Sequence, residues 1–299
     1  MRERLQVLLL FLFPVVLMAG LYALKLKLPV PALGRDYVIR VELPDAGRLI
    51  GLPKIEGPPD ASRPLVVIDA GHGGHDPGAN GGGMEEKRLV LGLALALRDR
   101  LLKQGGIRVA LTRSDDTFLV LQERAEIARR LGADLFLSIH ADSAGDDGGV
   151  SGASVYTLSE KASDEAAARF AARENSADRV NGISLSGRSD AVSAILVDLS
   201  QRRAQAESAE FAGLIVREGQ GSIAFHPDPR RSAALAVLRA PDVPSVLFEA
   251  GFITNPDDAK RLTSPEGQAR FADAMERAIR IYFARNSGTA ISSTPSPAE

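Results

Sequence analysis

Short apolar runs alternate along this chain with longer segments in which apolar residues recur at helical spacing. Three of these runs lie at residues 65–71, 135–139 and 246–248. Both faces of each run are mostly apolar, which is typical of a buried strand in a parallel sheet. The pattern therefore predicts a buried sheet that helices flank.

The remaining periodicity completes an alternation of strands and helices. Further strands are expected at residues 107–112, 152–158 and 234–238. Helices are expected at residues 87–104, 119–131, 163–183, 191–218 and 265–284. Such an alternation is typical of βαβ units. The sequence thus predicts an α/β fold, in which one domain has a twisted, mostly parallel central sheet flanked by helices.

The boundaries of this domain follow from changes in composition. We expect the compact domain to run from residue 64 to residue 285, with a helical insert at about residues 160–222. Residues 25–63 hold many prolines and one short alternating run, so they are expected to form a tether. Residues 286–299 are rich in Ser, Thr and Pro and are expected to be a disordered tail.

The first 24 residues favour export of the rest of the chain. Arg2 and Arg4 precede an apolar stretch over residues 5–24, which is long enough to span a bilayer. Basic residues before such a stretch direct the remainder outward. Because no clean small-residue cleavage site is present, residues 1–24 are either a signal peptide or a signal anchor. We expect an exported, periplasmic protein, which is anchored to the inner membrane if this segment is not cut.

The composition narrows the chemistry. The chain has 299 residues, a formal net charge of −2, four histidines and no cysteine. This charge gives no reason to expect a nucleic-acid partner. Without cysteine, any metal must be held by His, Asp and Glu side chains. We expect an ordinary globular protein that acts as a monomer.

Each of the three apolar runs leads into a residue that can bind a metal or transfer a proton. His72 follows the first run, His140 follows the second and Glu249 follows the third. In open α/β sheets, functional groups gather at the carboxyl ends of the strands. Two imidazoles and a carboxylate at one such edge predict a metal-centred hydrolase.

The loop over residues 71–83 is rich in glycine, which lets the backbone approach a ligand closely. It lacks the Gly-Lys-Ser/Thr ending of a phosphate-binding loop, and a histidine stands where a dinucleotide-binding turn should be bare. A lone histidine after a strand is more often structural. Here Glu86 and His140 favour the metal site.

The chain resembles a known family along the whole compact domain. Residues 67–74 and 76–79 resemble the opening motif of the zinc-dependent N-acetylmuramoyl-L-alanine amidases, the cell-wall amidases of the AmiA, AmiB and AmiC type. The likeness continues in order at residues 86–87, 111–113, 121–124, 136–142 and 236–255. The resemblance implies a peptidoglycan hydrolase that cleaves the amide between the lactyl group of N-acetylmuramic acid and L-alanine, in cell-wall remodelling and daughter-cell separation.

The same resemblance implies the site residues. One Zn²⁺ per chain would be held by His72, Glu86 and His140 with a water in the open position, which is an established set for catalytic zinc. Glu86 is preferred over its neighbour Glu85 because the family's ligand directly precedes a lysine. Glu249 corresponds to the catalytic glutamate, which takes a proton from the zinc-bound water and passes it to the leaving amine.

The insert resembles a regulatory element of the division-associated amidases. In those relatives an inserted helix covers the metal and supplies a glutamate to it, until an activator removes the block. We expect Glu165, with Glu174 as the second choice, to play this part here. The apolar stretch over residues 191–199 would be the docking face for an activator protein. The alternative is a packed helix pair that only shields the sheet.

Several other polar residues have less certain roles. Asp69 or Asp142 would accept a hydrogen bond from a ligand imidazole. Arg113 and Arg124 are expected to form structural ion pairs. For His226, a contact to the substrate or the water and a simple loop role both stay open.

Two rival functions are considered beside the amidase. One is another zinc amide hydrolase, such as a deacetylase, and the other is a metal-free wall-binding or regulatory protein. The presence of all four residues that the resemblance requires argues against the second rival.

Overall fold

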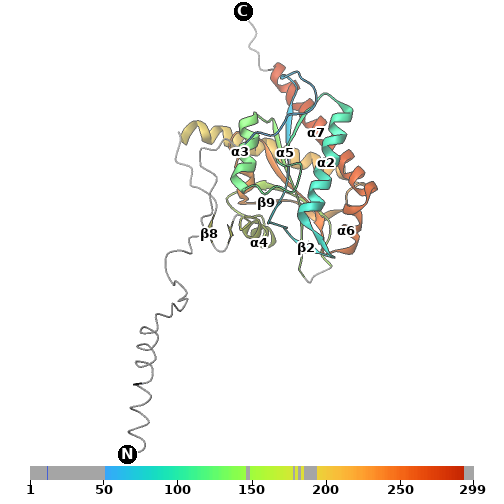
Figure 1. Ribbon diagram of the computed structural model, residues 1–299. Helices are drawn as coiled ribbons and strands as arrows, with labels where there is room; N and C mark the ends of the chain where they lie inside the picture. The colour runs from blue at the N-terminus through green and yellow to red at the C-terminus, as the bar shows by residue number, and fades with distance from the viewer. Residues whose placement is uncertain are drawn as a thin grey trace, which may run out of the picture. The chain divides into compact units, whose positions relative to one another are not determined.

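The computed structural model describes, besides Leu12, residues 51–292 with gaps at 146–148, 178, 181–182 and 185–193 (Figure 1). Apart from Leu12, the predicted signal segment at residues 1–24 lies outside the described residues, as do the tether as far as residue 50 and the last seven residues of the tail. The same holds for the side chains of residues 191–199, the predicted activator-docking face. Within the described part of the chain, no helix combines the length and the apolar character that a membrane span requires.

A sheet of six strands, in the order β4-β1-β5-β10-β6-β9, forms the centre of the domain. These strands are β1 (Leu65–Ala70), β4 (Arg108–Leu111), β5 (Leu135–Asp142), β6 (Ala153–Leu158), β9 (Phe225–Ala233) and β10 (Ser245–Phe252). The first four strands in this order are parallel, β6 is antiparallel to β10, and β9 is parallel to β6. The predicted mostly parallel sheet is therefore confirmed. Two further sheets have two antiparallel strands each, β2 (Asn80–Gly81) with β3 (Met84–Glu85) and β7 (Arg179–Val180) with β8 (Ile183–Ser184).

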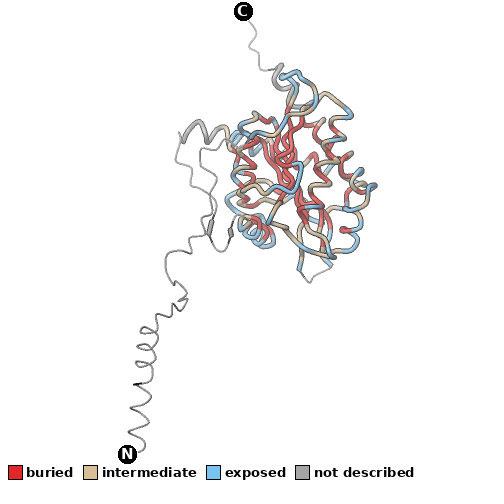
Figure 2. The backbone as a smooth tube through the Cα atoms, in the orientation of Figure 1, coloured by how far each residue is buried: buried red, intermediate tan, exposed pale blue. Residues whose placement is uncertain are grey.

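Helices cover both faces of the sheet (Figure 1). One face packs against α2 (Glu86–Gln104), α5 (Ala194–Gly219) and α7 (Pro265–Ser292). The other face packs against α3 (Leu121–Leu131), α4 (Glu165–Glu174) and the 3-10 helix η1 (Ala236–Leu238). The short helix α6 (Pro256–Thr263) follows β10. Buried residues follow the sheet and the inward sides of the helices (Figure 2).

The alternation of side chains along the strands decides which face receives the polar residues. On β1, Val66 and Ile68 belong to the core that α2 and α7 cover, whereas Val67 belongs to the core that α3 and α4 cover. On β5, Ile139 belongs to the first core, so its neighbour His140 lies on the face of α3 and α4. The same rule places Glu249 of β10 on that face. The two residues are partners in the register of β5 and β10.

One predicted strand is wrong. Residues 234–238 do not form a strand, because η1 spans Ala236–Leu238 and the edge strand is the preceding β9. Two prolines, Pro227 and Pro229, lie within this edge strand. The sheet tolerates them because β9 lies at its edge and carries a bulge, where the register passes from Ala153↔Phe225 to Val155↔Arg230.

Several predicted boundaries differ from the observed ones. The helix predicted over residues 163–183 ends at Glu174, since the next residue, Asn175, turns its side chain to the segment before η1 and bonds to Ala234 O and Ala236 N, each at 2.8 Å. The last helix extends through Ser292 and into the predicted tail. The end of the predicted tether pairs with the sheet edge, because Glu56 N donates to Val109 O at 2.8 Å.

A buried ion pair joins the sheet to α3. The side chains of Asp69 and Arg124 are at most 2% exposed, and Arg124 Nη1 lies 2.9 Å from Asp69 Oδ1. The hydroxyls of Thr112 and Ser138 also donate to Asp69, at 2.6 and 2.7 Å. Burial alone would raise the pKa of Asp69, but the Arg124 charge and these hydroxyls lower it below the usual value. Asp69 is therefore ionised and fully satisfied.

We predict that Asp69→Asn lowers the free energy of unfolding by about 3 kcal/mol or more, because it leaves the Arg124 guanidinium buried without its counter-charge. Denaturant unfolding of the full chain measures this. The control is Arg129→Gln, which removes the exposed ion pair with Asp242 and should cost less than about 1 kcal/mol. Equal, small losses for both variants would contradict the role given to Asp69.

Candidate metal centre

The glycine-rich loop after β1 presents His72 in a strained backbone conformation. His72 has a φ of 58°, and among the described residues it is the only non-glycine residue with a positive φ. Two glycines make room for the surrounding side chains. A Cβ on Gly71 would lie 2.4 Å from the His140 ring, and one on Gly78 would lie 2.6 Å from both Glu86 and the His72 ring. The loop can therefore close on the histidines only with glycine at these two positions.

Two buried arginines hold this loop by its carbonyl groups. Arg124 donates to Ala70 O at 2.8 Å and to His72 O at 2.7 Å. Arg113 donates to Ala70 O at 2.8 Å and to Gly71 O at 2.6 Å. Of the two predicted structural ion pairs, Arg124 thus forms one with Asp69, while Arg113 acts mainly on the backbone. These hydrogen bonds to the loop carbonyl groups hold the strained turn at His72 in place.

Glu86, the first residue of α2, bridges the two histidines. Its Oε1 atom lies 3.1 Å from His72 Nε2 and 3.1 Å from His140 Nδ1. The backbone N–H groups of Ala141 and Ala79 donate to its two oxygens, at 2.9 and 2.8 Å. The carboxylate is therefore held in one orientation, with one oxygen directed at both rings.

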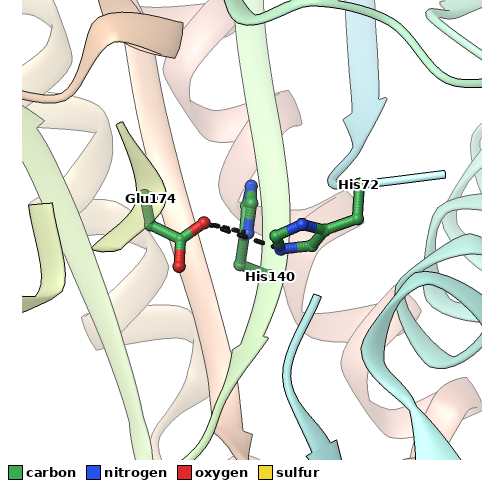
Figure 3. Close-up of side chains that lie close together, drawn as sticks. All are labelled: His72, His140 and Glu174. Atoms are coloured by element: carbon green, nitrogen blue, oxygen red, sulfur yellow. Dashed lines mark ion pairs between the residues drawn. The ribbon is translucent and has the colours of Figure 1, made fainter. Parts of the chain in front are cut away.

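A second carboxylate, Glu174 at the end of α4, reaches the same two histidines. Its Oε2 atom lies 3.1 Å from His140 Nδ1 and 3.5 Å from His72 Nε2, and the three side chains point toward one another (Figure 3). His72, His140 and Glu174 are buried and close enough to hold one metal ion. Sequence reasoning ranked Glu165 first for this position, but the structure places Glu174 beside the histidines. Glu165 is 86% exposed and pairs with Arg169.

The remaining nitrogen of His72 is bound by a residue that sequence reasoning missed. His72 Nδ1 lies 2.7 Å from Asp76 Oδ2, which fixes the ring so that Nε2 faces Glu86. This role had been considered for Asp69 or Asp142. Asp69 instead binds Arg124, and Asp142 pairs with Arg173. The available signal was the spacing of His72 and Asp76 within one tight turn, where Gly73 and Asp76 exchange two backbone hydrogen bonds.

The charges in this cluster hold one another in place. Burial would lower the pKa of His72, but the Glu86 charge and the hydrogen bond to Asp76 raise it to about 10. Burial likewise opposes a proton on His140, and the charges of Glu174 and Glu86 raise its pKa to about 10. Burial would raise the pKa of Glu86, and the two histidines lower it well below its usual value. The two imidazoles therefore keep a positive charge beside the carboxylates, and a metal cation bound by the same nitrogens would replace their protons.

The donor set fits a zinc ion. Zinc in proteins is bound tetrahedrally by His and Glu at about 2.0 Å, which corresponds to about 3.3 Å between neighbouring ligand atoms. The oxygen–nitrogen separations from Glu86 and Glu174 to the rings of His72 and His140, four of the six in the cluster, run from 3.1 to 3.5 Å. His72 Nε2 and Glu174 Oε2 are buried, and neither atom has a hydrogen-bond partner. Atoms of this kind are expected where a metal completes the site.

Glu249 lies on the neighbouring strand, beside His140. Its Oε1 atom accepts a hydrogen bond from Asp142 N, and its Oε2 atom is buried without a hydrogen-bond partner. Burial raises the pKa of Glu249 well above its usual value, and the charges of Asp142, Glu86 and Glu174 raise it further. A cavity of about 540 Å³ opens beside it. Such a carboxyl group is suited to accept and return a proton.

Comparisons with known proteins identify the family of this chain. Residues 66–280 match the family model Amidase_3, described as N-acetylmuramoyl-L-alanine amidase. The chain is 36% identical to the N-acetylmuramoyl-L-alanine amidase AmiA of Escherichia coli strain K12 over 270 residues, 90% of each chain. It is 37% identical to the amidase AmiC of Escherichia coli O6:H1, where the match covers 74% of this chain and 54% of AmiC.

A solved structure supports the same assignment. The N-acetylmuramoyl-L-alanine amidase AmiC2 of Nostoc punctiforme superposes with a TM-score of 0.54 and 30% identity, and the match covers 76% of this chain and all of that one. The family model alone spans most of the compact domain, from β1 to α7. The chain therefore belongs to the Amidase_3 family of N-acetylmuramoyl-L-alanine amidases.

Proposed function

We propose that this protein is a zinc-dependent hydrolase of peptidoglycan that cleaves the amide between the lactyl group of N-acetylmuramic acid and L-alanine. The observation that carries the proposal is the convergence of His72, Glu86 and His140 on one point, with Glu249 on the adjacent strand. These first three residues would hold the zinc. When bound, zinc would lower the pKa of a water and polarise the scissile carbonyl.

Glu249 would carry the proton in this reaction. Its free Oε2 atom would take a proton from the attacking water as the new C–O bond forms. The same group would return the proton to the nitrogen of L-alanine as the C–N bond breaks. The hydrogen bond from Asp142 N to its other oxygen keeps Glu249 oriented during both transfers.

In the state described here, the site would be closed by α4. Glu174 occupies the corner of the cluster where a substrate or water would have to enter. The helix is held there by the ion pair of Arg173 with Asp142 and by the stacking of Phe170 on Tyr156, with ring centroids 4.6 Å apart. We propose that this helix inhibits the enzyme and that an activator protein, docked on the insert at residues 160–222, displaces it.

This activity would belong outside the inner membrane. The substrate lies in the periplasm, and the apolar stretch at residues 5–24 supports export. We propose that the protein acts there in cell-wall remodelling and daughter-cell separation.

We predict that Glu174→Ala raises the rate of wall hydrolysis at least tenfold without any activator, because it empties the corner that the carboxylate fills. Release of L-alanine-initiated peptides from purified wall, followed by mass spectrometry, measures the rate. Glu165→Ala is the matched control, since its exposed side chain lies outside the cluster, and its rate should stay unchanged. An unchanged rate in a folded Glu174→Ala protein would sink the inhibitory role of α4.

Glu249→Gln should lower kcat by about 10²- to 10⁴-fold, because glutamine cannot accept the proton. It should leave one zinc per chain, as the side chain is not a proposed ligand. The substitution is tested alone and in combination with Glu174→Ala, and bound zinc is measured by elemental analysis. A loss of zinc together with activity would mean that Glu249 binds the metal.

Metal removal gives the third check. A chelator should abolish peptide release, and added Zn²⁺ should restore it in the wild-type chain. His140→Ala should reduce the bound zinc below one per chain and should not recover on addition of zinc, because a ligand is missing. Full activity after complete metal removal would refute the zinc mechanism.

A further inference from the structure

The cavity beside Glu249 continues under α4 toward the edge of the sheet. Its walls include Tyr156 of β6, His226 and Arg231 of β9, and Phe170 of α4. A bulge in β9 after Phe225 shapes this wall, since the register shifts there by several residues. Bulges at a sheet edge re-aim side chains toward a site. The cavity therefore joins the proposed proton carrier to a basic wall.

Arg231 is the fixed cation of this wall. Its side chain is 12% exposed, and its Nη2 atom lies 3.1 Å from His226 Nδ1. Its Nε atom donates to Asp228 O at 3.3 Å. These contacts hold the guanidinium in place and leave its charge to be balanced by an anion from the cavity side.

In this structure the anion comes from α4. The carboxylate of Asp164 lies 3.5 Å from Arg231 Nη1, with 42% of its side chain exposed. Asp164 is also the N-cap of α4, because its side chain accepts the N–H of Ala167 at 2.8 Å. The helix thus begins with a carboxylate at Arg231 and ends with the Glu174 carboxylate between the histidines.

The spacing of these two carboxylates matches a peptide. Ten helical steps separate Asp164 from Glu174, which at 1.5 Å per residue is about 15 Å. An extended peptide covers the same distance in about four or five residues. The cavity also contains Glu249, which in the proposed function delivers a proton to the leaving amine. Because that amine is the first nitrogen of the stem peptide, the cavity lies on the peptide side of the scissile bond.

We propose that Arg231, supported by His226, forms a subsite for a carboxylate of the stem peptide about four residues from the scissile amide, and that Asp164 occupies this subsite while α4 is closed. This inference rests on the proposed function. It extends that function, because it names the group of the substrate that the enzyme selects. Helix α4 then blocks the groove at both ends, because Asp164 lies at Arg231 and Glu174 lies between the two histidines.

The test measures binding of a product-like peptide to the full chain by calorimetry. The probe is a stem tetrapeptide that starts in L-alanine and has free carboxylates, compared with the same peptide in amidated form. Arg231→Gln should weaken binding of the acidic peptide at least tenfold, because a charge-assisted hydrogen bond is lost. It should leave the weaker binding of the amidated peptide unchanged.

A second variant is expected to strengthen binding of the acidic peptide. Asp164→Asn keeps an N-cap side chain, since Asn caps helices as well as Asp, but removes the competing charge. It should tighten binding of the acidic peptide severalfold, which a purely structural role of Arg231 does not produce. The matched control is Arg230→Gln on the same strand, where the side chain is exposed and should not affect binding.

Four outcomes would overturn the inference, of which the first three concern single variants. They are equal losses for both peptides in Arg231→Gln, a similar loss in Arg230→Gln, and no tightening in Asp164→Asn. Absence of acidic-peptide binding in all variants would overturn it as well. Because binding is measured without turnover, the inference and the proposed function fail separately: normal peptide binding with no release of peptides from the wall refutes the amidase activity and leaves the subsite intact.

Discussion

The structure depends on a set of buried charges that must neutralise one another. Glu86 and Glu174 direct carboxylate oxygens at His72 and His140, in a place where all four side chains are at most 7% exposed. Burial of an uncompensated charge costs several kcal/mol, so none of these groups can be ionised there without its partners. A single divalent cation would compensate the buried carboxylate charges in the same way. The chemistry of the site follows from this constraint.

The fold serves to bring these groups together from distant parts of the chain. The parity of side chains along β5 and β10 places His140 and Glu249 on one face and next to each other. The parallel order of β1 and β5 brings the loop with His72 to the same edge. Beneath that loop, Arg124 and Asp69 join the strand to α3. A sheet that is rigid in its core can thus hold a strained turn at its edge.

Much of this arrangement could be predicted from the sequence, and the rest could not, for physical reasons. Buried parallel strands have a strong apolar signature, so the sheet and the residues at its strand ends could be predicted. The edge strand β9 could not, since its two prolines are tolerated only through a bulge that depends on its neighbour. Asp76 was missed because its contact with His72 depends on the loop backbone.

The choice between the two insert glutamates shows the same limit in one helix. The buried residues of α4 are Ala167, Phe170, Ala171 and Glu174, which recur at helical spacing. Glu174 therefore lies on the apolar stripe, where a carboxylate is unusual, whereas Glu165 lies on the solvent side. The periodicity carried this signal, but only the docked helix shows that the stripe faces the histidines.

The central claim is that these side chains share one zinc ion, and X-ray absorption of the zinc-loaded full chain tests it most directly. The account predicts four nitrogen or oxygen neighbours at about 2.0 Å, with the outer-shell scattering of two imidazole rings. A spectrum without imidazole scattering, or a zinc surrounded by six oxygens, would contradict the account.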